Sequence, residues 1–180
     1  SYRVVDASRL YGAENPNFSL SFQGLKNNET VPKWTEDPNY TTEATTSSSV
    51  GKYIVYATAN PTNYALTINP GILTITPATL TIKANNASRL YFDADPEYTY
   101  VATGFLNGDT DTSFTQTPKF KTDATLASNV GTYTITPYGA ESKNYNINYA
   151  TGNLTITKRM LTATVDAISR EYGENNPPFS

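Results

Sequence analysis

The chain has 180 residues, of which 38% are hydrophobic and 16% are charged, with a net charge of −3, and this is not the composition of a disordered chain. It contains no Cys and no His, which excludes disulfides, thiol nucleophiles, Ser-His-Asp relays and thiolate or imidazole metal sites. Lys and Arg are scattered singly, so nucleic acid is not an expected partner, and no segment approaches the roughly 18 consecutive apolar residues of a membrane-spanning helix.

Short strands are predicted along the whole chain by apolar residues that alternate with Thr, Lys or Asn. In chain order these segments are residues 73–76, 80–83, 98–102, 133–136, 145–149 and 154–157. Turn residues separate them. The pairs at 27–28 (Asn-Asn) and 107–108 (Asn-Gly) tolerate the positive φ of tight turns. The pattern predicts an all-β fold with small β-sandwich units of Ig-like topology, and a β-grasp-like topology is the alternative.

A fixed order of short words repeats along the chain. Residues 8–12 (SRLYG) return 80 residues later at 88–92 (SRLYF), and again 81 residues later at 169–173 (SREYG). Other words keep the same spacing: 24–30 with 104–110 (GLKNNET, GFLNGDT), 50–53 with 130–133 (VGKY, VGTY), and 73–76 with 154–157 (LTIT in both). A unit of this length can enclose its own core, unlike solenoid repeats of about 20–50 residues.

These spacings predict three units. Repeat 1 comprises residues 1–77, repeat 2 comprises residues 78–158, and residues 159–180 are the truncated start of repeat 3. Since the pattern is already under way at the first residues and stops early in repeat 3, we interpret the chain as a piece of a longer protein.

The joints between the repeats contain almost no loop. Residues 73–82 (LTITPATLTI) lead from the last predicted strand of repeat 1 directly into the first strand of repeat 2, and residues 154–163 (LTITKRMLTA) have the same shape. Neither joint is rich in Gly and Ser, and the ring of Pro77 restricts the backbone of the first one. We therefore expect a semi-rigid, elongated array.

Taken in order, the words resemble the MBG domain of the YGX type, a mostly β repeat of long bacterial surface proteins. The resemblance rests on Tyr-Gly at 11–12 and 172–173, the Asn-Pro-x-Phe words, residues 104–110, Val-Gly-x-Tyr, and Asn-Tyr followed by Leu-Thr-Ile-Thr. It covers essentially the whole chain. It implies a cell-surface or secreted location, a structural or adhesive role and no enzyme activity, and it carries no ligand residues with it. Repeat 2 departs at Phe92, where the family has Gly, which predicts that this turn does not strictly require a positive φ.

Four aromatic residues are candidates for ligand contact. Trp34, the only tryptophan, could stack on a glycan, but Phe114 takes its place in repeat 2, which favours an aromatic anchor of the core. Tyr40, Tyr56 and Tyr138 are candidate contacts if they are exposed, and each could equally face inwards.

Arg9, Arg89 and Arg170 stand beside the repeated Tyr, which we interpret as a packing residue. We expect each arginine to cover apolar surface with its stem or to cap a carbonyl with its guanidinium, and binding of an acidic partner is the alternative.

Acidic residues do not form a motif that predicts a metal or a catalytic pair. Asp93, Asp95 and Glu97 alternate and could present oxygens on one face, but repeat 1 has no acid at the corresponding positions. The Asp109/Asp111 pair is not shared with repeat 1 either, and neither set matches the acidic loop of a high-affinity calcium site. No acid pair recurs for hydrolysis, so we expect no cofactor and no catalysis.

These observations predict a non-enzymatic structural repeat of an extracellular or bacterial cell-surface protein, which acts as a stalk that presents a distal domain. The expected partners are the neighbouring repeats. The alternative is an adhesin module that binds a glycan or a host protein through surface aromatics, and an accessory module of a carbohydrate-active enzyme is a third class.

Overall fold

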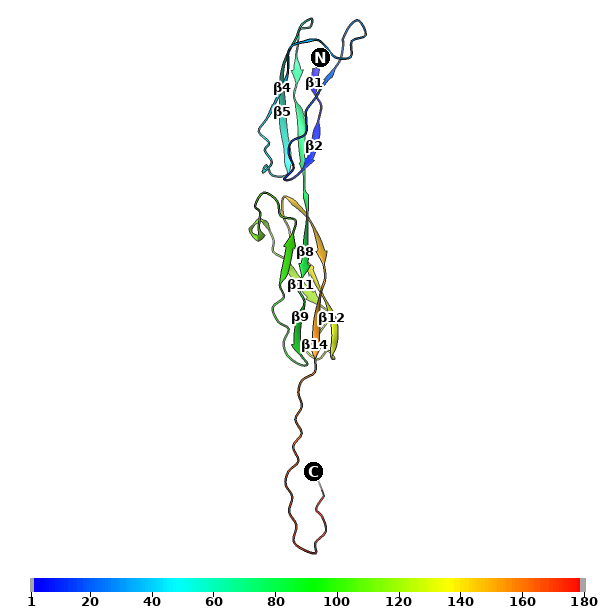
Figure 1. Ribbon diagram of the computed structural model, residues 1–180, viewed down its shortest axis with the longest axis vertical. Coiled ribbons are helices and arrows are strands. Elements are labelled where there is room, and N and C mark those ends of the chain that lie inside the picture. The colour runs from blue at the N-terminus through cyan, green and yellow to red at the C-terminus, as the bar shows by residue number, and fades with distance from the viewer. Residues whose placement is uncertain (1, 179–180) are drawn as a thin grey trace.

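The alternation of apolar and polar residues forms strands in the computed structural model, which describes residues 2–178 (Figure 1). Repeat 1 consists of β1 (Tyr2–Val4), β2 (Ala7–Leu10), β3 (Leu20–Phe22), β4 (Trp34–Thr42), β5 (Gly51–Pro61), β6 (Ile68–Asn69) and β7 (Gly71–Thr76). Repeat 2 consists of β8 (Ala78–Ala84), β9 (Ala87–Leu90), β10 (Tyr100–Thr103), β11 (Lys119–Thr122), β12 (Gly131–Tyr138), β13 (Tyr145–Ala150) and β14 (Gly152–Thr157), with one 3-10 turn, η1 (Asp111–Ser113). The predicted all-β fold in tandem repeats is confirmed.

Each repeat contains a three-stranded and a four-stranded sheet with the same order. The sheets are β3-β1-β6 and β2-β7-β5-β4 in repeat 1, and β10-β8-β13 and β11-β12-β14-β9 in repeat 2. The first two strands of each repeat pair in parallel with its last two: β1 with β6, β2 with β7, β8 with β13 and β9 with β14. All other pairings between the strands are antiparallel. The choice between an Ig-like and a β-grasp-like topology stays a prediction, as do the boundaries of the repeats.

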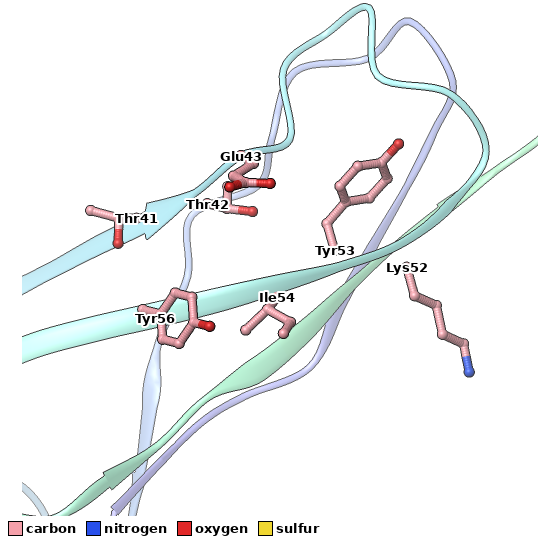
Figure 2. Close-up of a pocket in the computed structure, with 7 residues that line it drawn as sticks. All are labelled: Thr41, Thr42, Glu43, Lys52, Tyr53, Ile54 and Tyr56. Atoms are coloured by element: carbon pink, nitrogen blue, oxygen red, sulfur yellow. The ribbon is translucent and has the colours of Figure 1, made fainter.

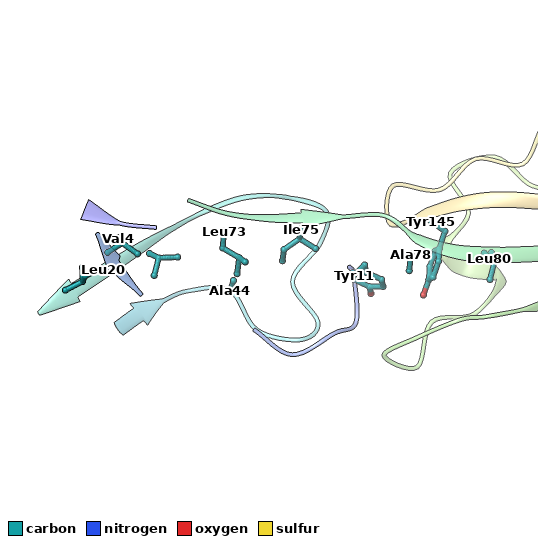
Figure 3. Packing of buried hydrophobic residues seen from close by; sticks show 10 residues of the cluster. Val4, Tyr11, Leu20, Ala44, Leu73, Ile75, Ala78, Leu80 and Tyr145 are labelled. Carbon is teal, nitrogen blue, oxygen red and sulfur yellow. The ribbon is translucent and has the colours of Figure 1, made fainter. Parts of the chain in front are cut away.

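The buried side chains form two clusters, and the larger one extends over both repeats (Figure 3). It joins Val4, Leu73 and Ile75 of repeat 1 to Leu80 and Tyr145 of repeat 2. The smaller cluster fills the rest of repeat 2 with Ala84, Ile135, Leu154 and Ile156. Full burial of such a side chain contributes about 1.5–3 kcal/mol, so this shared packing stabilises both repeats together.

Two turns have the backbone conformation that the sequence predicts, and a third turn differs from the prediction. Asn27, Asn28 and Asn107 adopt positive φ, as the turn pairs predict. Phe92 also has a positive φ, of 67°, so the prediction that this turn does not require it was wrong. The turn runs from Leu90 to Asp93 and is closed by the Asp93 N–H, which donates to the carbonyl of Leu90 at 3.2 Å, while Tyr91 N–H donates to the carbonyl of Thr157 at 2.8 Å.

Beyond β14 the chain leaves repeat 2 as an extended segment (Figure 1). None of residues 158–178 lies in a strand, and Met160, Leu161 and Tyr172 are exposed. In the part of the chain that the structure describes, no helix is long and apolar enough to cross a membrane.

Candidate functional site

Polar groups of repeat 1 and repeat 2 are hydrogen-bonded to each other at the joint between the repeats. A single residue, Pro77, separates β7 from β8. Leu73 and Ile75 are buried before it, and Ala78 and Leu80 are buried after it, so the buried set shifts by one residue at the proline. Each strand therefore turns its apolar side towards its own repeat, while the backbone runs on with no flexible linker between them.

Two tyrosines from different repeats share one carboxylate at this joint. Tyr11, directly after β2, donates its hydroxyl to Asp109 Oδ2 at 3.0 Å, and Tyr145, the first residue of β13, donates to the same oxygen at 2.7 Å. The two rings meet edge to face with their centroids 5.5 Å apart, and the residues are only 3% and 4% exposed. Bonds to an ionised acceptor are the stronger kind, so this cluster ties the repeats to each other.

Burial keeps Tyr145 in its neutral, donating form. The pKa of Tyr145 is raised to about 12, chiefly by burial; the N–H of Leu106, which donates to the hydroxyl at 2.8 Å, acts to lower the pKa, and the hydrogen bond to Asp109 acts to raise it. The Tyr145 hydroxyl thus donates one hydrogen bond, to Asp109, and accepts another, from the N–H of Leu106.

The loop that carries Asp109 also packs directly against repeat 1. Gly12 has a φ of 80° and faces Leu106, and a Cβ at this glycine would lie 2.7 Å from Leu106 Cδ1. Asn107 Nδ2 donates to the carbonyl of Thr46 at 3.2 Å. Only a glycine combines this φ with so close an approach.

Asn144 accepts two further hydrogen bonds at the joint. The N–H of Val50 donates to Asn144 Oδ1 at 3.0 Å, and the N–H of Ala78 donates to the carbonyl of Asn144 at 3.0 Å. Asn144 thereby holds both the end of a repeat 1 loop and the first strand of repeat 2.

The same acid–tyrosine pair exists within repeat 1. Tyr64, the counterpart of Tyr145, donates to Glu29 Oε2 at 2.5 Å and accepts from the N–H of Lys26 at 3.1 Å. Glu29 and Asp109 are equivalent positions in the two repeats, as are Tyr64 and Tyr145, but the repeat pattern does not show that they are hydrogen-bonded. The recurrence of an acid and a tyrosine in both repeats could have indicated these pairs. Nothing in the pattern linked Tyr11 of repeat 1 to the pair in repeat 2.

The other end of repeat 2 carries a different set of contacts. Tyr91, the counterpart of Tyr11, is 37% exposed, and Arg159 donates to its carbonyl at 3.0 Å. Arg159 also forms an ion pair with Asp93. Arg159 stands where the first joint has Ala78, so the two joints are not chemically equivalent.

The aromatic candidates are not brought together in one site. Trp34 and Tyr40 both lie on β4 and are half-buried, with Trp34 against Phe22 at 5.8 Å and Tyr40 against Phe18 at 6.0 Å between ring centroids. Burial also raises the pKa of Tyr40. Tyr138 ends β12 in the other repeat and is exposed.

The two buried arginines cap carbonyls, and the interpretation drawn from the sequence is confirmed for both. Arg9 donates to the carbonyls of Leu10 at 3.1 Å and Thr45 at 2.5 Å. Arg89 donates to the carbonyls of Leu90 and Thr125 at 3.3 and 2.7 Å.

Asp95, one of the acids considered for calcium, is bonded to two neighbouring side chains. Asp95 Oδ1 pairs with Arg89 Nε at 2.6 Å, and Asp95 Oδ2 accepts from the hydroxyl of Tyr98 at 2.9 Å. Within residues 2–178 no group of three or more acidic side chains is arranged to hold a metal ion.

A shallow groove of about 710 Å³ crosses β4 and β5 on the outer face of repeat 1 (Figure 2). The ends of Thr41, Glu43 and Ile54 and the ring of Tyr56 line it. Tyr56 is exposed, which makes it the one candidate aromatic of repeat 1 that faces solvent.

Comparison with known proteins agrees with the repeat pattern. No match to the chain was found among curated proteins. The family model of the MBG domain (YGX type) matches twice, over residues 2–74 and over residues 80–155. Repeats of this family are typical of extracellular or surface proteins. The chain thus belongs to the MBG domain (YGX type) family, as a tandem array of two matched repeats.

Proposed function

We propose that these repeats form a non-enzymatic, semi-rigid spacer of a bacterial cell-surface or secreted protein and that they present a distal domain. The joint is the observation that carries this proposal. A single proline links the strands, the apolar core extends across the boundary, and a shared carboxylate bonds tyrosines from both repeats. A spacer transmits position through such joints, because bending would break several contacts at once.

The stiffness of the joint can be measured directly with spin labels, since the chain contains no cysteine of its own. Asn39 and Lys119 are exposed and occupy equivalent positions in the two repeats. With Asn39→Cys and Lys119→Cys, double electron–electron resonance should give a narrow distribution of distances between the labels. The matched comparison inserts Gly-Ser-Gly-Ser after Thr76, which should broaden the distribution because such linkers behave as flexible coils. An equally broad distribution without the insertion would refute the spacer proposal.

Adhesion is the second candidate function, and one observation favours it. The exposed Tyr56 has Thr136 as its counterpart, so at this position an aromatic faces solvent in repeat 1 and not in repeat 2. A residue that the fold needs would be expected in both repeats, whereas a contact for a ligand need not recur.

A further inference from the structure

Three apolar side chains stand together on the outer face of repeat 1. Ile54 and Tyr56 on β5 are 52% and 56% exposed, and Ile72 on β7 is 37% exposed. Ile54 and Ile72 are paired residues in the register of β5 and β7, so their side chains adjoin on the same face. We call these three residues the outer patch.

Repeat 2 has a polar face at the same place. Its counterparts of the outer patch are Thr134, Thr136 and Asn153, and Thr134 is paired with Asn153 just as Ile54 is with Ile72. Since both repeats have the same strand order, the fold does not require apolar residues at these positions. The same fold thus forms without apolar residues at these positions, and the exposed outer patch of repeat 1 is available for contact with another molecule.

Polar groups border the patch on the side of β4. Thr41 is paired with Tyr56 across the β4–β5 register, and Glu43 lies just beyond the end of β4, on the rim of the groove (Figure 2). Within residues 2–178 neither the carboxylate of Glu43 nor the hydroxyl of Tyr56 has a hydrogen-bond partner. The groove thus offers an exposed aromatic ring beside a free acceptor and two hydroxyl groups.

We propose that the outer patch and its polar rim bind a neutral carbohydrate chain. The ring of Tyr56 would lie against the apolar face of a sugar, with Ile54 and Ile72 beneath the neighbouring unit. Glu43 would accept hydrogen bonds from sugar hydroxyls, and the Thr41 hydroxyl would donate to or accept from another. The ligand is neutral because Lys52 and Glu43 supply one charge of each sign along the groove.

The size of the surface distinguishes this ligand from a protein. A stable protein interface covers about 800 Å² on each partner, which three apolar side chains on an otherwise polar face do not provide. The groove volume of about 710 Å³ instead falls within the range of about 300–1,000 Å³ for small-ligand sites. The site lies on the outer face of a sheet and uses no residue of the joint, so it does not depend on the spacer proposal.

The experiment is an NMR titration of the full chain with four neutral hexasaccharides: cellohexaose, maltohexaose, mannohexaose and N-acetylchitohexaose. The test variant combines Ile54→Thr, Tyr56→Thr and Ile72→Asn, which places the residues of repeat 2 on repeat 1. The matched control is Val101→Ser, which replaces an exposed apolar residue of repeat 2 by the serine that repeat 1 has there, Ser21. Thermal unfolding followed by circular dichroism, which reports on the strands of both repeats, verifies that each variant is folded.

Saturable shifts at the amides of β4 and β5 with at least one sugar are the expected result. The triple variant should weaken this binding by at least about tenfold, as the loss of an aromatic anchor does, and the control should leave it unchanged. Installing Thr134→Ile, Thr136→Tyr and Asn153→Ile should create a second site on repeat 2.

Three results would overturn the proposal. The first is that none of the four sugars shows saturable binding, and the second is that binding persists unchanged in the triple variant. The third is self-association that depends on protein concentration and that the triple variant abolishes. The last would make the outer patch an interface between copies of the chain.

Discussion

At the scale of single residues, each repeat contains one buried arginine that closes a long loop. Arg9 Nε donates to Asn15 Oδ1 at 2.8 Å, and its other nitrogens bond to the carbonyls of Leu10 and Thr45. Because the residue is 8% exposed, water would not readily replace these donors. Arg9 therefore stabilises its loop through neutral acceptors, whereas Arg89 also forms an ion pair with Asp95.

Replacing this arginine should destabilise repeat 1 strongly. Arg9→Ala leaves buried carbonyls without donors, and we expect it to lower the free energy of unfolding by about 2–4 kcal/mol. Arg3→Ala is the matched control, because Arg3 forms an exposed ion pair with Asp6 that is worth less than about 1 kcal/mol. Urea unfolding monitored by Trp34 fluorescence measures both variants. Equal, small losses would show that Arg9 has no special role.

At the scale of the structural element, the turn after β2 determines how closely the repeats approach. Gly12 and Gly24 both have positive φ, 80° and 86°, but only Gly12 faces the other repeat. A Cβ at Gly24 would have nothing within 4 Å. Comparison of the two positions separates the backbone strain from the packing at the joint.

Gly12→Ala should destabilise the protein more than Gly24→Ala. Both changes carry the cost of a left-handed alanine, roughly 1–2 kcal/mol, and Gly12→Ala adds about 1–3 kcal/mol for the overlap with Leu106. Thermal unfolding of the two variants measures the difference. Adding Leu106→Ala to the first variant should recover only part of this second loss, because the Cβ of residue 106, 3.0 Å from the added Cβ, remains. If the two glycine variants are equally stable, the joint tolerates a side chain and is less tightly packed than we infer.

The joint should also weaken in alkaline solution. The pKa of Tyr145 is raised to about 12 in the folded protein from an ordinary value near 10. Its contribution to stability is therefore complete below pH 10 and is lost as the pH rises from 10 to 12. Urea unfolding followed by circular dichroism between pH 9 and pH 12.5 should show this loss.

Tyr145→Phe provides the comparison for this pH profile. Tyr98, whose pKa is raised to about 12 by burial and by Asp95, titrates in the same range and is present in both proteins. The difference between the two profiles therefore isolates Tyr145, and parallel profiles would contradict its role.

At the scale of the whole molecule, the shared core couples the stability of one repeat to contacts made by the other. The larger cluster contains buried residues of both repeats, and Asp109 of repeat 2 holds Tyr11 of repeat 1. Trp34 is the only tryptophan and lies in repeat 1, so its fluorescence reports on that repeat alone.

Asp109→Ala should consequently lower the melting temperature seen by Trp34, although the change lies in the other repeat. The loss of a shared acceptor should cost about 1–3 kcal/mol, and each kcal/mol corresponds to about 4–8 °C for a domain of this size. Asp109→Asn keeps an acceptor oxygen and should lose less. Asp123→Ala, at an exposed acid of repeat 2, is the control and should leave the transition unchanged. An unchanged transition in Asp109→Ala would mean that the repeats unfold independently.

Much of the molecule could be predicted from its sequence. The constant spacing of the words revealed the tandem repeats, the alternation of apolar and polar residues revealed the strands, and Asn-Asn and Asn-Gly marked the turns. These features are local or compare the chain with itself, so they require no knowledge of which residues meet in space.

Only the tertiary structure decided the rest, because it depends on contacts between distant segments. Tyr11 and Asp109 are 98 positions apart and meet only when the repeats stack. The positive φ of Phe92 belongs to the turn that the Asp93 N–H closes on the carbonyl of Leu90, and a phenylalanine side chain does not favour it. Alternation shows that one side of a strand is buried, but it does not bring Ile54 and Ile72 together. Their common outward face arises from the antiparallel pairing of β5 with β7, and that register is a property of the folded sheet.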